Sequence, residues 1–299
     1  MTNTNKDIYT GMGLAVLAAI IWSGNFIVAR GVSQQIPPIS LAFYRWSMAT
    51  LIMLPIAWKG FRQQAPLLKQ HSTYLFWTAL SGITLFNTFV YIAGHYTQAI
   101  NLALIGTTSS PVFAIILAAL FLKERIKPLR VVGLLLCIAG IILLLSQGSW
   151  QKLQAFHFTA GDGWILLAAL SFAIYTIFVR RKPAAIQPIL FLFTVFAIGT
   201  LVLLPFYVWE MTQAPPVQWN LSLVGIILYL GAGASVMAFL FWNMAIGKLG
   251  AARTALFGNL IPVFSTLEAV WILNEEFLMV HVVSGVLEIA GVVIANLKK

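Results

Sequence analysis

The sequence has few charged residues and almost no cysteine. Only 9% of its 299 residues are charged, while 60% are hydrophobic and the mean hydropathy is +0.92. A soluble domain carries about a quarter charged residues, and a globule this apolar could not cover its surface with polar groups. The composition therefore excludes a water-soluble enzyme. The one cysteine, Cys137, cannot form an internal disulfide and is expected to be a small buried hydrophobe.

The sequence also lacks the motifs of intramembrane catalysis and of ATP binding. It contains no GxxxxGKS or GxxxxGKT loop, no HExxH, no GxSxG, and no Cys or His pairs at metal-ligand spacing. No aspartate lies within an apolar segment. These absences argue against an enzyme working inside the membrane. We expect no catalytic residue, no cofactor and no metal, and a process that uses a gradient.

Apolar segments long enough to cross a bilayer run along the whole chain. They cover residues 12–29, 41–58, 74–92, 100–122, 131–146, 164–179, 188–208, 221–246, 254–273 and 277–297. Lipid offers no hydrogen bonds, so each segment must satisfy its own backbone groups as a helix. The sequence predicts an all-α integral membrane protein with ten transmembrane helices. The first segment is too long for a removable signal peptide and is expected to be retained.

The positive net charge of +10 indicates membrane orientation rather than nucleic-acid binding. Most basic residues lie in links that share one side when the N-terminus is placed in the cytoplasm, such as Lys59, Lys123 and Arg181. The acidic residues Asp162 and Glu275 then fall in links on the outer side. We therefore predict a multi-pass protein of the plasma (inner) membrane with both termini in the cytoplasm.

The two halves of the sequence resemble each other at a shift of about 150 residues. Residues 17–22 match residues 167–172, and in later segments the shift grows by one. Other matched pairs are Arg30 and Arg180, Pro38 and Pro188, Pro111 and Pro262, and Glu124 and Glu275. Each half holds an odd number of segments, so the second copy enters the membrane from the opposite side. This predicts two inverted five-helix repeats, at 8–150 and 160–299, an arrangement typical of secondary transporters.

Several of these residues also carry a family resemblance. The run Trp22-Ser23-Gly24-Asn25, Arg45, and Pro111 followed by Leu122-Lys123-Glu124-Arg125 resemble the EamA family of the drug/metabolite transporter superfamily. Pro262 with Asn274-Glu275-Glu276 resembles its second copy. The resemblance implies ten helices in two inverted halves, around a central cavity lined by segments one to four and six to nine. It also implies metabolites such as amino acids as substrates, usually exported.

Three charged residues lie inside apolar segments, where charge is costly and by default marks a transport pathway: Arg45, Glu268 and Glu288. Arg45 and Glu268 lie at matching depth and are expected either to pair, or to act separately. Arg45 would then hold a substrate carboxylate or extend to the outer interface. Glu268 is a candidate for proton coupling, with a structural partner role as the alternative. Glu288 is expected to serve helix packing.

Polar and aromatic side chains near the midplane complete the predicted substrate site. Trp22 and Asn25 lie one turn apart, and Asn87 and Tyr91 share a helix face. The full set of predicted substrate-binding residues is Trp22, Asn25, Arg45, Asn87, Tyr91, Thr107, Tyr175, Trp242 and Asn259. Pro111 and Pro262 each remove a backbone donor inside a segment, and we predict that this matched pair marks gating helices.

These features predict a secondary transporter of small organic metabolites, most simply an exporter of amino acids or related amphipathic solutes that works by alternating access. Proton coupling through Glu268 and uniport are both open. Nucleosides, sugar derivatives or drugs are the alternative substrates, and an intramembrane enzyme is the alternative class. The expected partners are a small-molecule substrate, the lipid bilayer and protons, with no nucleic acid, in a monomer or weak homodimer.

Overall fold

A computed structural model describes residues 5–122, 128–146, 149, 151, 159–249, 254 and 257–296, and these residues contain helices but no strand. The α-helices of the first half are α1 (Asn5–Gly31), α2 (Pro38–Gln70), α3 (Ser72–Ala79), α4 (Phe86–Gly94), α5 (Ala99–Leu122) and α6 (Pro128–Leu145). Those of the second half are α8 (Ala160–Arg180), α9 (Pro188–Gln213), α10 (Leu221–Leu228), α11 (Ala238–Leu249), α13 (Ile261–Leu273) and α14 (Met279–Asn296). Two π-helices, η1 (Leu80–Leu85) and η2 (Tyr229–Met237), and a 3-10 turn, η3 (Gly258–Leu260), complete the described elements.

Seven of the described helical stretches are long and apolar enough to cross a membrane. They are Asp7–Gly31, Pro38–Gln70, Ser72–Gly94, Ala99–Phe121, Ala160–Val179, Pro188–Gln213 and Leu221–Ala245. Shorter apolar helices cover Val131–Gly140, Ile261–Leu273 and Met279–Gly291. The all-α membrane fold is thereby confirmed, because every predicted apolar segment contains a helix in its described part. That all ten cross the bilayer remains a prediction.

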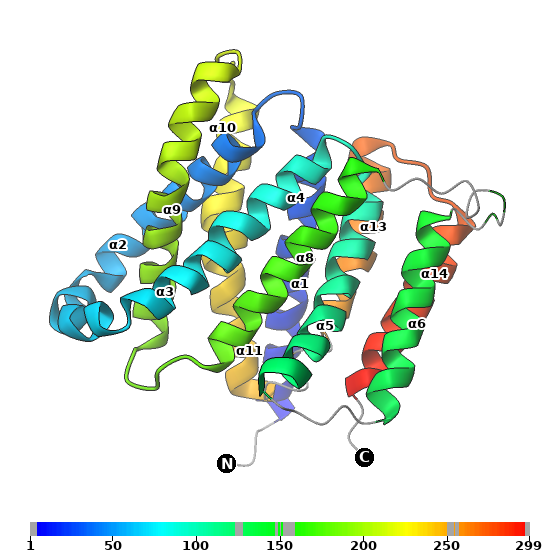
Figure 1. Ribbon diagram of the computed structural model, residues 1–299, viewed down its shortest axis with the longest axis horizontal. Coiled ribbons are helices and arrows are strands. Elements are labelled where there is room, and N and C mark those ends of the chain that lie inside the picture. Colours follow the sequence, from blue (N-terminus) through cyan, green and yellow to red (C-terminus); the bar gives the residue numbers. More distant parts are fainter. Residues whose placement is uncertain are drawn as a thin grey trace.

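The helices stand side by side in one bundle, and α1 begins at the same end of it as α14 ends (Figure 1). The opposite end, called here the distal end, carries the links at 31–37, 95–98, 214–220 and 274–278. Helices α6 and α14 form a closely packed pair at one side. A Cβ atom on Gly291 would lie 2.6 Å from the carbonyl oxygen of Gly133, so these two backbones nearly touch. Cys137 is buried in this pair, as the sequence predicted.

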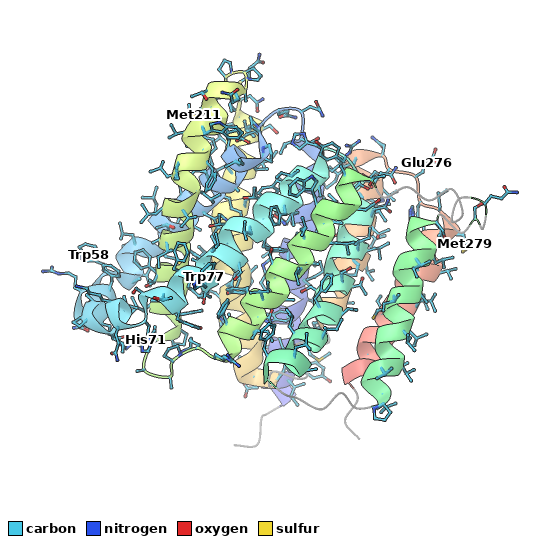
Figure 2. The ribbon with its side chains drawn as sticks, in the orientation of Figure 1. Trp58, His71, Trp77, Met211, Glu276 and Met279 are labelled. Atoms are coloured by element: carbon cyan, nitrogen blue, oxygen red, sulfur yellow. The ribbon has the colours of Figure 1, made fainter. Side chains whose placement is uncertain are left out.

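Helix α2 is longer than its apolar segment predicts. At 1.5 Å per residue its 33 residues span about 50 Å, well beyond the hydrocarbon core of about 30 Å. The apolar segment ends at Trp58, but the helix continues through Lys59, Arg62 and Lys69 and ends before His71 (Figure 2). The backbone stays helical because Leu68 is buried against the bundle while the basic side chains point into solvent.

Helices α2 and α9 cross each other at equivalent points of the sequence repeat. The hydroxyl groups of Thr50 and Thr200 lie 3.3 Å apart, and these residues are partners at the shift seen in the sequence. Toward the distal end the hydroxyl groups of Tyr44 and Tyr207 lie 2.7 Å apart, so the two helices run antiparallel. The first helix of each half also packs on matching helices of the other half. Helix α1 packs on α11 and α13, while α8 packs on α4 and α5.

Each half contains a π-helix at a corresponding place. The segment η1 joins α3 to α4, and η2 joins α10 to α11, so both interrupt the third long helix of their half. The wider turns lie against the other half, and glycine makes the contacts possible. A Cβ on Gly82 of η1 would lie 2.2 Å from the ring of Tyr175, and one on Gly231 of η2 would lie 2.5 Å from Met48 Cγ. Such turns leave no mark on hydrophobic periodicity, so the sequence did not predict them.

Candidate functional site

A cluster of buried polar side chains surrounds Arg45 of α2. The Arg45 side chain is only 4% exposed and points into the bundle rather than to a membrane interface. Its Nη1 donates to the side-chain oxygens of Asn25 and Asn87, the latter at 2.9 Å. The same nitrogen lies 2.9 Å from the Tyr91 hydroxyl, which itself donates to Asn25 Oδ1 at 3.0 Å. The Nε atom donates to Ser235 Oγ at 2.9 Å.

The sequence explains how these side chains converge. Asn87 and Tyr91 lie four residues apart on one face of α4, and Asn25 comes from α1. The structure thus brings together four predicted residues, Asn25, Arg45, Asn87 and Tyr91. It adds Ser235 of η2, which the sequence analysis missed because its run of small residues is typical of close helix packing.

The positive charge of Arg45 has no acidic partner among the residues that the structure describes. No carboxylate of the described residues lies within 4.0 Å of its guanidinium group. Neutral oxygens and the Trp46 ring, 4.8 Å from Cζ, surround it instead. Its Nη2 makes no hydrogen bond within the described part of the chain. A buried cation without a counter-charge is costly, so the cluster is suited to receive an anionic group.

Glu268 occupies a separate position, on α13. Its Oε1 accepts a hydrogen bond of 2.7 Å from the Ser23 hydroxyl, while Oε2 is buried and has no hydrogen-bond partner in the described part of the chain. Ser265 donates to the Ser23 carbonyl at 3.0 Å and fixes this contact between α1 and α13. Neither Ser23 nor Ser265 was singled out in the sequence as a separate functional residue.

The expected pair of Arg45 and Glu268 does not form in this structure. Their partners on α1, Asn25 and Ser23, are two residues apart and therefore point to different faces of that helix. Helix α13 packs on α1 and α5, whereas α2 packs on α9 and η2. The two charged residues therefore have separate hydrogen-bond partners on α1 and do not bond to each other.

Aromatic rings of α1 and α11 lie next to η2, which supplies Ser235 to the cluster. Trp22 donates from its indole nitrogen to the Ala234 carbonyl oxygen at 2.9 Å. Its ring centroid lies 5.2 Å from that of Trp242 and 5.4 Å from that of Phe239. Trp22 and Trp242 are thus in contact, as a shared site requires. Tyr175 is buried elsewhere, against η1 and 5.6 Å from Phe172 between ring centroids.

The remaining predicted residues are spread over several elements of both halves. The Thr107 hydroxyl donates to Ala103 O of its own helix at 2.7 Å. Pro111 lies within the continuous helix α5, whereas Pro262 is the second residue of α13, directly after the 3-10 turn η3. The matched prolines therefore stand in different local structures, because a first-turn proline has no helical hydrogen bond to lose. The side chains of Pro111, Asn259 and Glu288 lie outside the described residues.

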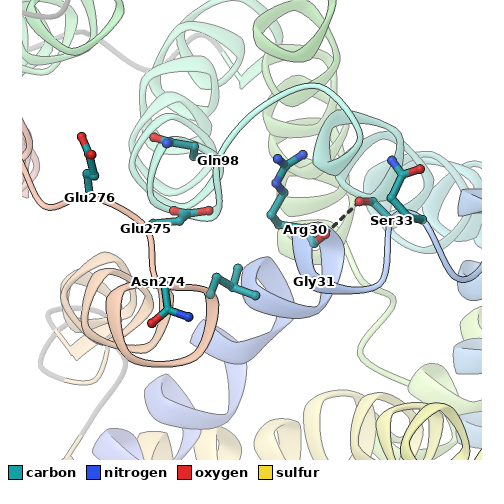
Figure 3. A pocket seen from close by; sticks show the side chains of 9 residues that line it. Arg30, Gly31, Ser33, Gln98, Asn274, Glu275 and Glu276 are labelled. Carbon is teal, nitrogen blue, oxygen red and sulfur yellow. Dashed lines mark hydrogen bonds between the residues drawn. The ribbon is translucent and has the colours of Figure 1, made fainter.

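Two cavities open at the distal end. The larger, of about 590 Å³, lies between the ends of α1, α4 and α13 (Figure 3). Its lining residues are Arg30, Gly31, Ser33, Gln34, Gln98, Leu273, Asn274, Glu275 and Glu276. The smaller, of about 240 Å³, lies between α2 and the link after α9, where Tyr44 and Trp219 contribute to its wall. Neither cavity includes Arg45 or Glu268, so the polar cluster is closed off from both.

A histidine stands near the larger cavity. His95 directly follows α4, outside the apolar helix. Burial lowers the pKa of His95, the negative charge of Glu210 opposes this, and the positive charge of Arg30 lowers it further. His95 is therefore largely neutral at pH 7, and Arg30 supplies the positive charge at this end of α1.

Long apolar helices around a closed polar cluster define a multi-pass membrane protein with an internal polar site. The chain belongs to the EamA-like transporter family, whose model matches residues 9–146 and again 159–297. The resemblance seen in the sequence is thereby confirmed, and this protein is an integral membrane transporter.

Relatives of known sequence agree with this assignment. An uncharacterized transporter of Archaeoglobus fulgidus is 30% identical, covering 96% of this chain and 97% of its own. A "probable amino-acid metabolite efflux pump" of Escherichia coli is 24% identical over 94% and 93%. An "S-adenosylmethionine uptake transporter" of Rickettsia conorii is 26% identical over 92% and 88%. One crystal structure shares the fold, with a TM-score of 0.60 and 19% identity over 98% and 96%.

Proposed function

We propose that this transporter exports amino acids or related amphipathic solutes across the plasma (inner) membrane by alternating access, with both termini in the cytoplasm. The observation that carries the proposal is the buried guanidinium group of Arg45, which polar neighbours surround but no described carboxylate neutralises. Arginine binds a carboxylate through two parallel hydrogen bonds, and its Nη2 is open for one of them. A substrate carboxylate would supply the missing negative charge.

The neighbouring side chains suit the rest of such a solute. Asn25 and Asn87 direct their oxygens at Arg45, which leaves their amide nitrogens available as donors. The rings of Trp22 and Trp242 provide an apolar surface for a side chain. Among the relatives, the name of one concerns efflux of an amino-acid metabolite, and that of another concerns uptake of S-adenosylmethionine. The first supports the substrate class and direction that we propose, and the second makes nucleoside-containing solutes and uptake the alternatives to test.

Inverted repeats at 8–150 and 160–299 would supply the movement. The contact between the repeat partners Thr50 and Thr200 in antiparallel helices supports a twofold relation between the halves. Rocking of one half against the other would then expose the cluster to each side in turn. Pro111 and Pro262 mark the helices that we propose as gates.

Glu268 is the proposed site of proton coupling. A carboxylate oxygen without any hydrogen-bond partner at this depth is stable only when it carries a proton or meets a cation during the cycle. The Ser23 hydroxyl, bound to the other oxygen, would tie a change at Glu268 to α1. Because α1 also holds Asn25, this helix connects the coupling residue to the substrate cluster.

Flux into proteoliposomes tests the substrate class. Radiolabelled amino acids, nucleosides and sugars should be compared in one panel, with solute recovered unchanged because no reaction is proposed. Transport of amino acids, lost in Arg45→Gln, is the expected result. Flux of nucleosides or sugars alone would replace the amino-acid proposal. A labelled product that differs from the solute added would contradict transport without catalysis.

Cysteine labelling in intact cells tests the orientation. Gln34→Cys, in the distal link after α1, should react with an impermeant maleimide from outside. Arg181→Cys, exposed just after α8, should react only in inverted vesicles. The reverse pattern would overturn the placement of the termini in the cytoplasm.

A further inference from the structure

The larger distal cavity is lined by both basic and acidic side chains. Arg30 makes one long hydrogen bond, from Nη1 to Gly94 O at 3.3 Å, and no carboxylate of the described residues lies within 4.0 Å of it. Glu276 is exposed and makes no hydrogen bond within the described part of the chain. Glu276 lies at one edge of the lining residues, and Gln98 and Glu275 lie between it and Arg30 (Figure 3). The cavity therefore presents separate positive and negative groups.

The second carboxylate of the cavity is already engaged. Glu275 accepts hydrogen bonds from the backbone amides of Ala99 and Ile100, at 2.7 and 3.1 Å, which caps the start of α5. This cap fixes the link after α13 against α5 and shapes the cavity. Of the two neighbouring acids, Glu276 is the one free to meet a ligand, and the Gln98 amide lies between it and Arg30 (Figure 3).

The cavity lies directly outside the polar cluster, on the same helices. Arg30 is five residues beyond Asn25 on α1, and Leu273 is five residues beyond Glu268 on α13, a rise of about 7.5 Å in each helix. Two of the cavity's lining residues are in close contact: a Cβ on Gly31 would lie 3.2 Å from Leu273 Cδ2. This contact between α1 and α13 is therefore part of the cavity wall.

We propose that this cavity is a second binding site for the solute, and that it takes a zwitterionic α-amino acid at the distal face. Arg30 would hold the carboxylate, and Glu276 would hold the ammonium group. The volume of about 590 Å³ lies within the range usual for small-molecule sites. This inference rests on the proposed function, because it assigns the same class of solute to a second position on its path.

Glu276 is exposed and Arg30 is half-buried, so water reaches both charges of the site. Solvent-exposed charge contacts contribute little binding energy and weaken with salt. The site would therefore be weak and fast to release, which suits a solute leaving the protein. It would also be selective for solutes that carry both charges at once, since each contact alone is too weak to hold a ligand.

Protection from cysteine modification tests the site without requiring transport. Gln34→Cys in a Cys137→Ala background places one accessible thiol in the cavity wall, and the protein is reconstituted in nanodiscs. A zwitterionic amino acid at millimolar concentration should slow reaction with a maleimide about threefold, whereas matched solutes with only the amine or only the carboxylate should not. High salt should remove the protection.

Three further substitutions separate this site from the central cluster. Arg30→Gln and Glu276→Gln should each abolish protection, while Arg45→Gln should abolish flux and leave protection intact. Protection that survives both cavity substitutions, or is lost in Arg45→Gln, would overturn the proposal. Normal amino-acid flux without any protection would overturn it too and leave the proposed function standing. Protection through Arg30 without flux of amino acids would support the cavity as a site and refute the proposed transported solute.

Discussion

The first half of the chain places Arg45 and Asn87 in its polar cluster, and the second half places Val195 and Ala238 at the matching positions. All four residues are buried, so the surrounding packing is alike although the chemistry differs. In the second half the space is filled with aliphatic groups that need no hydrogen bond. The comparison teaches that matching positions of the two halves are packed alike, while the polar groups that we propose to bind the solute come mainly from the first half.

The first helix of each half shows the same contrast. Trp22 of α1 donates a hydrogen bond to the Ala234 carbonyl oxygen in η2. Its repeat partner on α8 is Phe172, which has no donor and packs on Phe86 with 4.7 Å between ring centroids. The exchange of an indole for a phenyl ring keeps the aromatic contact and removes the polar one. Among the described residues, a side-chain hydrogen bond to the main chain therefore joins α1 to η2, and none joins the matching helix α8 to η1.

The largest effect is expected from removing the charge that distinguishes the halves. Arg45→Gln should lower amino-acid flux at least about 30-fold, because losing a buried contact to a charged group costs several kcal/mol. Arg45→Lys keeps the charge but not the planar fork, and it should lose nearly as much. Initial flux rates in proteoliposomes measure both, with amounts of folded protein matched by gel filtration. Activity close to wild type in Arg45→Gln would place the carboxylate elsewhere.

A large but narrower effect is expected at Glu268, whose repeat partner is Leu117. Glu268→Gln should abolish flux driven by a pH gradient and spare solute exchange, since exchange needs no net proton movement. The matched control is Ser265→Ala, which removes a neighbouring hydroxyl and leaves the carboxylate in place. Flux with and without a pH gradient measures the effect. If Glu268→Gln responds to the gradient as wild type does, Glu268 is not the coupling residue.

A smaller effect on flux is expected from substituting Asn25, and almost none from substituting its repeat partner Tyr175. Asn25 accepts hydrogen bonds from both Arg45 and Tyr91, so Asn25→Ala leaves two buried donors without their acceptor and should cost about tenfold in flux. Tyr175→Phe removes one hydroxyl from a ring that packs against η1, and flux should change less than about twofold. Equal losses in both variants would show that both halves bind the solute.

Much of the candidate site is visible in the sequence because charge and amides are rare inside apolar segments. Arg45, Asn25, Asn87 and Tyr91 are conspicuous for that reason, and the spacing of the last two predicts their common face. Ser235 could not be recognised in this way, because a serine among small residues is equally typical of a binding site and of a close helix contact. Its role depends on η2, and π-turns leave composition and hydrophobic pattern unchanged.

The fold class follows from hydropathy, whereas the partners of individual residues do not. Depth along a helix can be estimated from residue number, and that estimate puts Arg45 and Glu268 at the same level and suggests a pair. The rotation of α1 between them is set by packing of distant segments, which a single sequence does not contain. The local structure at Pro262 is a similar case, because whether a proline bends a helix or begins one depends on the residues before it.

The smallest effect tests the twofold relation itself. Thr50 and Thr200 share one hydrogen bond at the crossing of α2 and α9, and both are repeat partners. Thr50→Ala and Thr200→Ala should each cost about 0.6 kcal/mol, the average for hydrogen bonds between membrane helices. The Thr200 hydroxyl also donates to Phe196 O of its own helix at 2.9 Å, so Thr50 is the donor in the shared bond. The double variant should therefore cost no more than Thr200→Ala alone, because Thr50→Ala removes only the shared bond. Unfolding in a denaturing detergent series measures all three. Costs that simply add would mean that the two hydroxyls do not bond to each other, and α2 and α9 would then not meet through equivalent groups.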